Sequence, residues 1–297
     1  MKIGLIGLGK MGGNLALNII DHGHDVVVYN RSAEKMVPYV EKGAIAGASL
    51  EELVGSLEAP RMIWVMVTAG DAVDHVIAEL TPLLDDGDTI IDGGNSFYKD
   101  TIRRAENLKE EGINLLDIGT SGGIDGARNG ACFMVGGDEE RFNAIEPLLA
   151  DISVDGGYGY FGKSGAGHFV KMIHNGIEYG MMQSIGEGFE VMEKSAFDID
   201  MSSAAKVWSN GSVIRGWLMD LAEEAYSEDP SLEKYSGAIG LSGEGEWSIA
   251  TAKELEVPVP AMDSSVDMRI KSKESPRYQG KVIQALRFGF GRHEQPS

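Results

Sequence analysis

Hydrophobic residues in the first half of the chain form short continuous runs, and stretches with helical spacing separate them. The runs lie at residues 2–7, 25–30, 61–67, 89–92 and 114–118. Continuous rather than alternating apolar runs are typical of parallel strands that are buried on both faces. The helical stretches lie at 11–22, 33–42, 71–84, 97–111 and 138–149. This order predicts a doubly wound α/β domain of the Rossmann type, with ligands at the carboxyl ends of its strands.

The pattern changes at the glycine-rich segment 155–167, DGGYGYFGKSGAG, after which runs typical of strands disappear. A long helix is predicted at 164–194, well beyond the usual length of about 11 residues. Shorter helices are predicted at 202–209, 212–226, 246–256 and 278–288. We therefore predict two domains, a Rossmann-type domain at 1–162 and an all-helical domain at 163–297.

A glycine-rich turn joins the first predicted strand to the first predicted helix. In GLIGLGKMGGN, Gly7, Gly9 and Gly12 have the spacing G-x-G-x-x-G, with Lys10 and Met11 between the last two. The pattern is weak alone but specific at the start of a βαβ unit, where it binds the pyrophosphate of a dinucleotide. We predict that these five residues contact the cofactor.

The end of the second predicted strand normally distinguishes NAD from NADP. A carboxylate there bonds the ribose 2′-hydroxyl of NAD, whereas an arginine accommodates the 2′-phosphate of NADP. Here Asn30 stands in the place of the acid, and Arg31 and Ser32 follow it. The sequence therefore favours NADP and leaves NAD as the alternative.

A mixed polar stripe runs along the long predicted helix in VKMIHNGIEYG, residues 170–180. Lys171, His174, Asn175, Glu178 and Tyr179 have the spacing of residues that share one face of a helix. A solvated face usually repeats Glu and Lys, whereas this stripe has one of each with His, Asn and Tyr between them. We predict that the stripe faces a functional cavity.

Apolar residues and two glycines cover the rest of this helix. Gly176 and Gly180 each cost about 1 kcal/mol of helix propensity, which indicates close packing against a neighbour. On the polar side, a partly desolvated Lys171 can act as a general base and Glu178 as a general acid. A Schiff-base role for Lys171 is the alternative.

Two loops follow strands at the same edge of the predicted sheet. DGGNS at 92–96 follows the strand at 89–92, and TSGG at 120–123 follows the strand at 114–118. Their glycines allow close backbone approach, and the side chains of Asn95 and Ser121 can bond a polyhydroxylated anion. We predict that both loops contact the substrate, the alternative being two plain turns.

Charge and composition narrow the classes of partner. The 297 residues include 46 acidic and 26 basic ones, a formal net charge of -20, which disfavours nucleic acid and anionic membranes as partners. The dispersed acidity suggests a halophilic protein, with an ordinary acidic enzyme as the alternative. The single cysteine, Cys132, excludes an internal disulfide, and neither a leader nor a membrane-spanning run is evident, so we expect a cytoplasmic protein.

These motifs together resemble the decarboxylating 6-phosphogluconate dehydrogenase family, of the β-hydroxyacid dehydrogenase superfamily. The resemblance extends over almost the whole chain, through GLGKMGGNLALNIIDHGH, YNRS, IIDGGNS, GTSGGIDGARNGACFMVGGD, GKSGAGHFVKMIHNGIEYGMMQ and LRFGFGRH. It implies oxidation of 6-phosphogluconate at C3, loss of CO2 and formation of ribulose 5-phosphate in the pentose phosphate pathway, without a metal. Lys171 would be the base and Glu178 the acid.

The resemblance also implies contacts with the substrate. These are Asn95, which also lies at the cofactor, Ser121, Gly122, Gly123, His174, Asn175, Tyr179, Arg269, Arg287 and His293. Arg287 and His293 match residues that a neighbouring subunit's tail contributes, which implies a homodimer or homotetramer assembled through the helical domain. Ser242 stands where longer relatives carry a phosphate-binding lysine, and the chain resembles the short prokaryotic form.

Two other functions stay open on the sequence. A dehydrogenase of a small 3-hydroxy acid, such as 3-hydroxyisobutyrate, would share the fold but would not need three cations at one site. A non-catalytic dinucleotide-binding sensor would have no use for Lys171 and Glu178.

Overall fold

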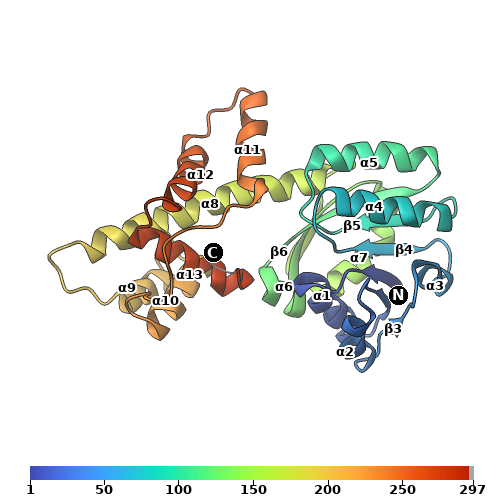
Figure 1. Ribbon diagram of the computed structural model, residues 1–297, viewed down its shortest axis with the longest axis horizontal. Coiled ribbons are helices and arrows are strands. Elements are labelled where there is room, and N and C mark those ends of the chain that lie inside the picture. The colour runs from blue at the N-terminus through green and yellow to red at the C-terminus, as the bar shows by residue number, and fades with distance from the viewer. Residues whose placement is uncertain (294–297) are drawn as a thin grey trace. The chain divides into compact units, whose positions relative to one another are not determined.

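The structure is a computed structural model that describes residues 1–293. The chain divides into two compact units, Met1–Met172 and a second unit that begins at Ile173. The division falls inside one continuous helix, α8 (Ala166–Glu193), which supplies residues to both units (Figure 1).

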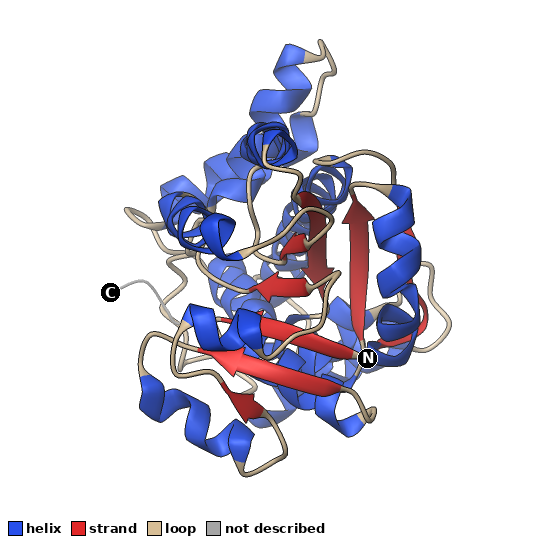
Figure 2. Ribbon diagram, turned by 90° about the vertical axis from the view of Figure 1, so that its right-hand side faces the viewer, coloured by secondary structure: helices blue, strands red, loops and turns tan. Residues whose placement is uncertain are grey.

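The first unit contains an eight-stranded sheet with the order β3-β2-β1-β4-β5-β6-β7-β8. Figure 2 shows its strands in red with helices around them. Neighbouring strands are parallel except β6 and β7, which are antiparallel. The strands are β1 (Lys2–Ile6), β2 (Asp25–Tyr29), β3 (Ile45–Ala46), β4 (Met62–Val65), β5 (Thr89–Asp92), β6 (Asn114–Ser121), β7 (Ala131–Gly136) and β8 (Ser153–Tyr160). The predicted doubly wound α/β class is confirmed.

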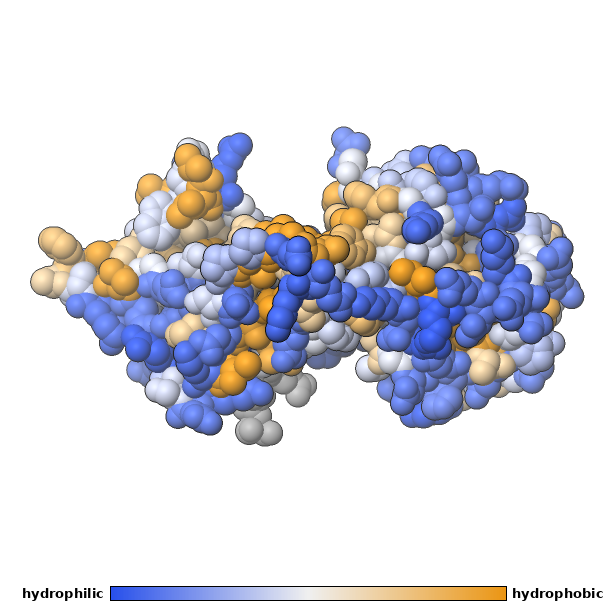
Figure 3. Space-filling view, turned by 90° about the horizontal axis from the view of Figure 1, so that it is seen from above, coloured by the Kyte–Doolittle hydropathy of each residue, from blue (hydrophilic) through white to orange (hydrophobic). Residues whose placement is uncertain are grey.

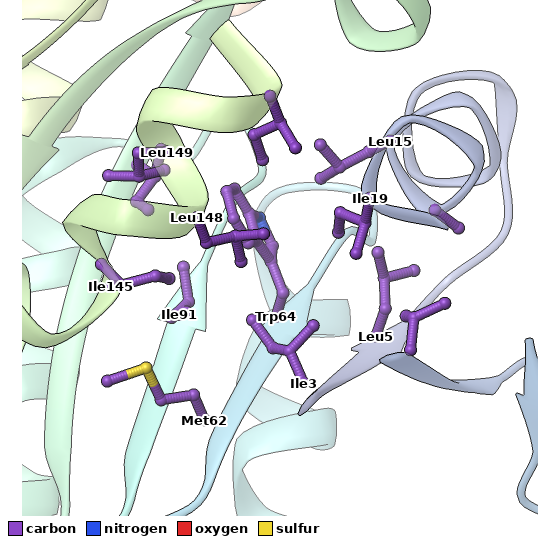
Figure 4. Packing of buried hydrophobic residues seen from close by; sticks show 14 of the residues in the cluster. Ile3, Leu5, Leu15, Ile19, Met62, Trp64, Ile91, Ile145, Leu148 and Leu149 are labelled. Atoms are coloured by element: carbon purple, nitrogen blue, oxygen red, sulfur yellow. The ribbon is translucent and has the colours of Figure 1, made fainter. Parts of the chain in front are cut away.

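Helices cover both faces of this sheet, as Figure 1 shows for α1 on one side and α4 and α5 on the other. The helical elements are α1 (Lys10–Asp21), η1 (Ala33–Met36), α2 (Val37–Val40), α3 (Leu50–Gly55), α4 (Asp71–Leu80), η2 (Thr81–Leu83), α5 (Tyr98–Glu110), α6 (Gly123–Asn129) and α7 (Glu139–Ile152). Successive strand residues alternate between two buried apolar clusters, one on each face. Trp64 of β4 is fully buried at the centre of one cluster, between side chains of α1 and α7 (Figure 4).

The second unit is helical in the part that the structure describes. After α8 come α9 (Met201–Ser209), α10 (Trp217–Glu228), α11 (Gly243–Glu254), α12 (Pro260–Ser272) and α13 (Tyr278–Gly291). Its own apolar core surrounds Phe189 of α8, Tyr226 of α10 and Leu286 of α13. A buried carboxylate, Glu190, accepts hydrogen bonds from Arg277 Nη2 and Gln279 Nε2, both at 2.7 Å. This network ties α8 to the start of α13.

Several elements differ from the sequence prediction. The glycine-rich segment that we expected to end the strands contains β8, an edge strand whose side chains are half-buried or exposed. Strands β3 and β7 and helices α3, α6 and α12 were not predicted, and α10 begins at Trp217 rather than at 212. Within residues 1–293, helices with the length and apolarity to cross a bilayer are absent.

Candidate active site

The glycine-rich turn after β1 has the geometry of a phosphate-binding loop. Gly7 has φ +96°, and a side chain there would collide with the carbonyl oxygen of Met66. A Cβ on Gly12 would collide with the carbonyl oxygen of Gly7, so this glycine lets α1 pack on the turn. A Cβ on Gly9 would meet no atom within 4 Å. The backbone at Gly9 is therefore open to a ligand, as a pyrophosphate requires.

Asn30 holds this turn in place. Its Oδ1 accepts a hydrogen bond from the backbone N–H of Leu8 at 3.0 Å, and its Nδ2 donates to the carbonyl oxygen of Ser32 at 3.2 Å. Arg31 beside it is exposed. We expected Asn30 to contact the cofactor directly. Its role in holding the turn could not be read from the sequence, because its partner Leu8 lies 22 residues away in the chain.

The DGGNS loop after β5 is organised by Asp92. This buried carboxylate accepts hydrogen bonds from Ser96 Oγ at 2.7 Å and from the N–H of Gly94 at 3.2 Å. Gly93 is pressed against the indole of Trp64, where a side chain would collide. Asn95 is the exposed member of the loop. The loop is thus rigid at its base and presents an amide to solvent.

The first two residues of the TSGG segment belong to a strand and not to a loop, because β6 continues through Ser121. Gly122 and Gly123 have φ +103° and +61°, and α6 begins at Gly123. Ser121 lies opposite Cys132 in the antiparallel pair of β6 and β7. Burial raises the pKa of the Cys132 thiol, and the nearby charge of Lys171 opposes this shift.

Asp117 of β6 fixes the start of α8. Its Oδ1 accepts a hydrogen bond from the N–H of Gly165 at 2.7 Å, and its Oδ2 accepts one from the N–H of His168 at 2.8 Å. These are N–H groups that a helix start leaves without intrahelical partners. Burial raises the pKa of Asp117, and the neighbouring His168 partly offsets the effect. The sequence analysis missed Asp117, since nothing near it in the chain marks it as a helix cap.

Three glycines allow the first turns of α8 to lie directly on β6 and β7. A Cβ on Gly119 would collide with the Cβ of Lys171, and one on Gly167 would collide with the carbonyl oxygen of Met134. On β7, a Cβ on Gly136 would lie 2.6 Å from the backbone nitrogen of Gly167. Glycine inside a strand often marks such a close approach, which was the signal available in the sequence.

The polar stripe of α8 is more buried than the apolar residues beside it. Lys171, Asn175 and Tyr179 are 7%, 8% and 5% exposed, whereas Ile177 and Met181 are 50% and 51% exposed. A solvated polar face would show the opposite. Ile177 and Met181, two of the apolar residues on the other sides of this helix, therefore do not pack inside the chain. The stripe therefore lies against protein, and the apolar flank is open.

Two further stripe residues complete this part of the helix. His174 Nδ1 lies 2.9 Å from Asn175 Oδ1 and 3.9 Å from Glu178 Oε2. Glu178 follows Lys171 by seven positions, which is almost two full helical turns and about 10 Å along the axis. Gly176 packs against Met262 and Ser248, as predicted.

The close packing predicted for Gly180 is wrong, because a Cβ there would meet no atom within 4 Å.

Tyr179 is the centre of a polar cluster in the helical unit. Its hydroxyl lies 2.7 Å from Ser242 Oγ, just before α11. The guanidinium carbon of Arg269, on α12, lies 3.3 Å from the centroid of the Tyr179 ring. Arg269 Nη1 donates to the carbonyl oxygen of Gly240 at 3.3 Å. The ring thus supports one face of the guanidinium.

Arg287 brings a second cation to this cluster. Burial lowers the pKa of Arg269 to about 10, and the positive charge of Arg287 also lowers it, while Tyr179 and two acidic groups oppose this shift. Burial lowers the pKa of Arg287 as well. Two partly desolvated cations at close range favour a bound anion.

The two tail residues named in the sequence analysis occupy different surroundings. Arg287 lies within the cluster of its own chain, beside Gly240, which differs from its expected place in a neighbouring subunit's site. His293 is exposed, and its ring packs on Phe290 with the centroids 5.6 Å apart. The structure thus brings Tyr179, Ser242, Arg269 and Arg287 together.

The described residues contain no group of three or more His, Cys, Asp or Glu side chains arranged to hold a metal ion.

The fold and the site together define a class of protein. A two-domain nicotinamide-dependent dehydrogenase has this architecture, in which a dinucleotide-binding sheet is followed by a helix with a buried lysine and then by a helical unit. The model of the NAD-binding domain of 6-phosphogluconate dehydrogenase matches residues 2–162, and that of its C-terminal domain matches residues 167–287. The chain belongs to the 6-phosphogluconate dehydrogenase family.

Individual relatives agree with this assignment. The Bacillus subtilis (strain 168) protein YqeC is 51% identical over 99% of this chain and 98% of its own length. The NAD(+)-dependent, decarboxylating 6-phosphogluconate dehydrogenase of Haloferax volcanii is 42% identical over 99% of this chain and 98% of its own length. The decarboxylating enzyme of Synechococcus elongatus is longer, and its 41% identity covers 91% of this chain but 61% of that protein.

Solved structures share the fold. Plasmodium falciparum 6-phosphogluconate dehydrogenase, studied with NADP+ and with 6-phosphogluconate, has a TM-score of 0.84 and 32% identity over 97% of this chain and 63% of its own. Mycobacterium tuberculosis 3-hydroxyisobutyrate dehydrogenase has a TM-score of 0.74 and 22% identity over 96% of this chain and 99% of its own. The second likeness shows the fold alone.

Gly119→Ala tests the contact that positions Lys171. The added methyl group collides with the Cβ of Lys171, so we expect the free energy of unfolding to fall by about 1–3 kcal/mol. Gly55→Ala in α3 is the matched control, because its Cβ would meet no atom within 4 Å. Urea unfolding measures both variants. Equal stability of the two would contradict the proposed close contact.

Proposed function

We propose that this chain catalyses the oxidative decarboxylation of 6-phosphogluconate to ribulose 5-phosphate and CO2, with reduction of NADP or NAD. The observation that carries the proposal is the buried Lys171 near the start of α8. Glu178 lies two helical turns further along the same helix. An amine and a carboxyl group at this spacing can serve a base-catalysed oxidation and a later protonation of one sugar-acid chain.

The reaction assigns one step to each group. Lys171 removes the proton of the C3 hydroxyl, and a bound nicotinamide dinucleotide would accept the hydride from C3, which gives a 3-keto acid. The C1–C2 bond then breaks and CO2 leaves. The electron pair of that bond passes to the 3-keto group, whose oxygen takes back the proton from Lys171, giving an enediol. Glu178 supplies a proton to C2 while Lys171 removes the proton of the C3 hydroxyl, which gives ribulose 5-phosphate. The substrate contacts that we assign beside them are Asn95, Ser121, Gly122, Gly123, His174 and Asn175.

The phosphate of the substrate is assigned to the cluster around Tyr179. Arg269 is a buried cation and Arg287 a half-buried one in a protein of net charge -20, and Tyr179 and Ser242 add hydroxyl groups. Phosphate oxygens suit such donors. A small 3-hydroxy acid lacks a phosphate group for these donors, which favours the phosphorylated substrate. His293 is proposed as a further contact.

Lys171→Met tests the base. The isosteric side chain cannot accept a proton, so we expect kcat to fall at least about 100-fold, measured by absorbance of the reduced nicotinamide together with CO2 release. Lys163→Met, at an exposed lysine just before α8, should behave as wild type. Reduction without CO2 release would reject the decarboxylation, and unchanged activity of Lys171→Met would indicate a different base.

The same assay in low and high salt tests the proposed halophilic character. Screening of the net charge of -20 should maintain activity as salt rises. Loss of activity in high salt would favour an ordinary acidic enzyme. A cytoplasmic location is also proposed, in keeping with the exposed free thiol of Cys132.

NADP is proposed as the preferred cofactor, with NAD as the alternative that the name of the Haloferax volcanii relative supports. Arg31 is exposed beside Asn30, whose side-chain amide bonds Leu8 and Ser32 and carries no negative charge to repel a 2′-phosphate. Arg31→Ala should raise the KM for NADP about tenfold, because one charge-assisted hydrogen bond to the 2′-phosphate is lost. The KM for NAD should stay unchanged. Lys42→Ala is an exposed control. An equal effect on both cofactors would contradict a contact between Arg31 and the 2′-phosphate of NADP.

A homo-oligomer, at least a dimer, is proposed from the open apolar flank of α8. Ile177 and Met181 lie one turn apart and are half exposed, and hydrophobic side chains gather on the surface of the helical unit (Figure 3). Met181→Glu should shift the mass in light scattering toward the monomer, because a carboxylate at such an interface costs its desolvation. Glu187→Gln, at an exposed position on α8, serves as the control. A wild-type protein that is monomeric would contradict the proposal.

A further inference from the structure

Glu244 is a buried acid beside the buried Arg269 and the half-buried Arg287. It lies in the first turn of α11 and is 9% exposed. Its Oε2 is buried and has no hydrogen-bond partner among the residues that the structure describes. A buried carboxylate oxygen without a donor is costly, so a retained one needs an explanation.

The unpaired acceptor has an unpaired donor near it. Arg269 is 1% exposed, and its Nη2 is also buried without a hydrogen-bond partner among the described residues. The charge of Glu244 acts on both Arg269 and Arg287, together with that of Glu178 and the hydroxyl of Tyr179 on α8. Glu178 and Tyr179 of α8 and Glu244 of α11 are thus the groups whose interactions with Arg269 of α12 and Arg287 of α13 raise the pKa of these arginines.

A ligand that satisfies this cluster must both accept and donate hydrogen bonds. A fully ionised phosphate ester has only acceptor oxygens, and one of them beside Glu244 would face another acceptor. The singly protonated ester keeps a P–OH group that can donate to a carboxylate, while its other oxygens accept from arginine. Sulfate, by comparison, carries no proton near neutral pH.

We infer that Glu244 is a specificity-determining residue that accepts a hydrogen bond from the protonated oxygen of a phosphate group held by Arg269 and Arg287. The cluster then selects phosphate over sulfate, and it selects the singly protonated form of a phosphate monoester over the dianion. This inference rests on the proposed function, which assigns the phosphate of the substrate to this cluster.

A purely neutralising role for Glu244 makes a different prediction. If the carboxylate served only to offset the two arginines, Glu244→Gln would strengthen the binding of every anion alike. If Glu244 instead accepts a hydrogen bond from a protonated phosphate oxygen, Glu244→Gln changes the ratio of the affinities for phosphate and sulfate. The glutamine amide can donate a hydrogen bond to sulfate, which the carboxylate cannot do. The ratio of the two affinities therefore separates the two roles.

Calorimetric titration of the full-length protein with inorganic phosphate and with sulfate tests the inference without relying on turnover. Wild type should bind phosphate at least about tenfold more tightly than sulfate, a difference of about 1.4 kcal/mol. Glu244→Gln should bind both anions within about threefold of each other. Glu246→Gln, an exposed acid two residues further along α11, should keep the wild-type ratio. Equal wild-type affinities, or an unchanged ratio in Glu244→Gln, would overturn the inference.

A pH series on the wild-type protein gives a second test that does not depend on the folding of a variant. The second pKa of a phosphate monoester is about 6, so the protonated form increases below that pH. The dissociation constant of methyl phosphate should therefore fall relative to that of sulfate between pH 7.5 and 5.5. A ratio that stays flat or rises would overturn the inference. Absence of 6-phosphogluconate turnover with an intact anion preference would reject the proposed function alone.

Discussion

The contact between the first turns of α8 and strands β6 and β7 is the constraint on which the remaining chemistry depends. Gly119 and Gly167 remove the side chains that would hold the helix away, and the buried carboxylate of Asp117 bonds its first free N–H groups. Close-packed interiors transmit small displacements, so the register of this contact sets the position of Lys171. The role proposed for Lys171, removal of one hydroxyl proton, leaves the amine little tolerance for such displacement.

Electrostatics constrain the helical unit in a comparable way. A protein of net charge -20 repels an anionic substrate over most of its surface, so attraction must be local. In the proposed function, the buried Arg269 and the half-buried Arg287 provide it, and desolvation lowers the pKa of each. Their burial has a second effect, because a cation with few water molecules around it gains more from a bound anion than an exposed one does. The ring of Tyr179 supports Arg269 without competing for its N–H groups.

The five apolar runs identified in the sequence all correspond to strands, because parallel strands buried on both faces need continuous apolar residues. Strand β8 was missed because an edge strand rich in glycine and exposed side chains carries no such run. The glycine-rich turn and the polar stripe of α8 were recognisable because local spacing defines them. The roles of Asp117, Gly119 and Glu244 were not, since each depends on a partner distant in the sequence or on burial.

The placement of both proposed catalytic groups on α8 has a geometric consequence. Lys171 lies one residue before the end of the first compact unit, and Glu178 belongs to the second. Since one uninterrupted helix carries both, their separation of about 10 Å along the axis follows from helix geometry and does not depend on the packing of either unit. The hydrogen bonds within α8 therefore maintain the spacing between the proposed base and the proposed acid. Contacts with β6 fix the position of Lys171, and contacts with α11 and α12 fix the part of α8 that carries Tyr179. Breaking the helix between them should uncouple oxidation from the final protonation more than it weakens either binding site.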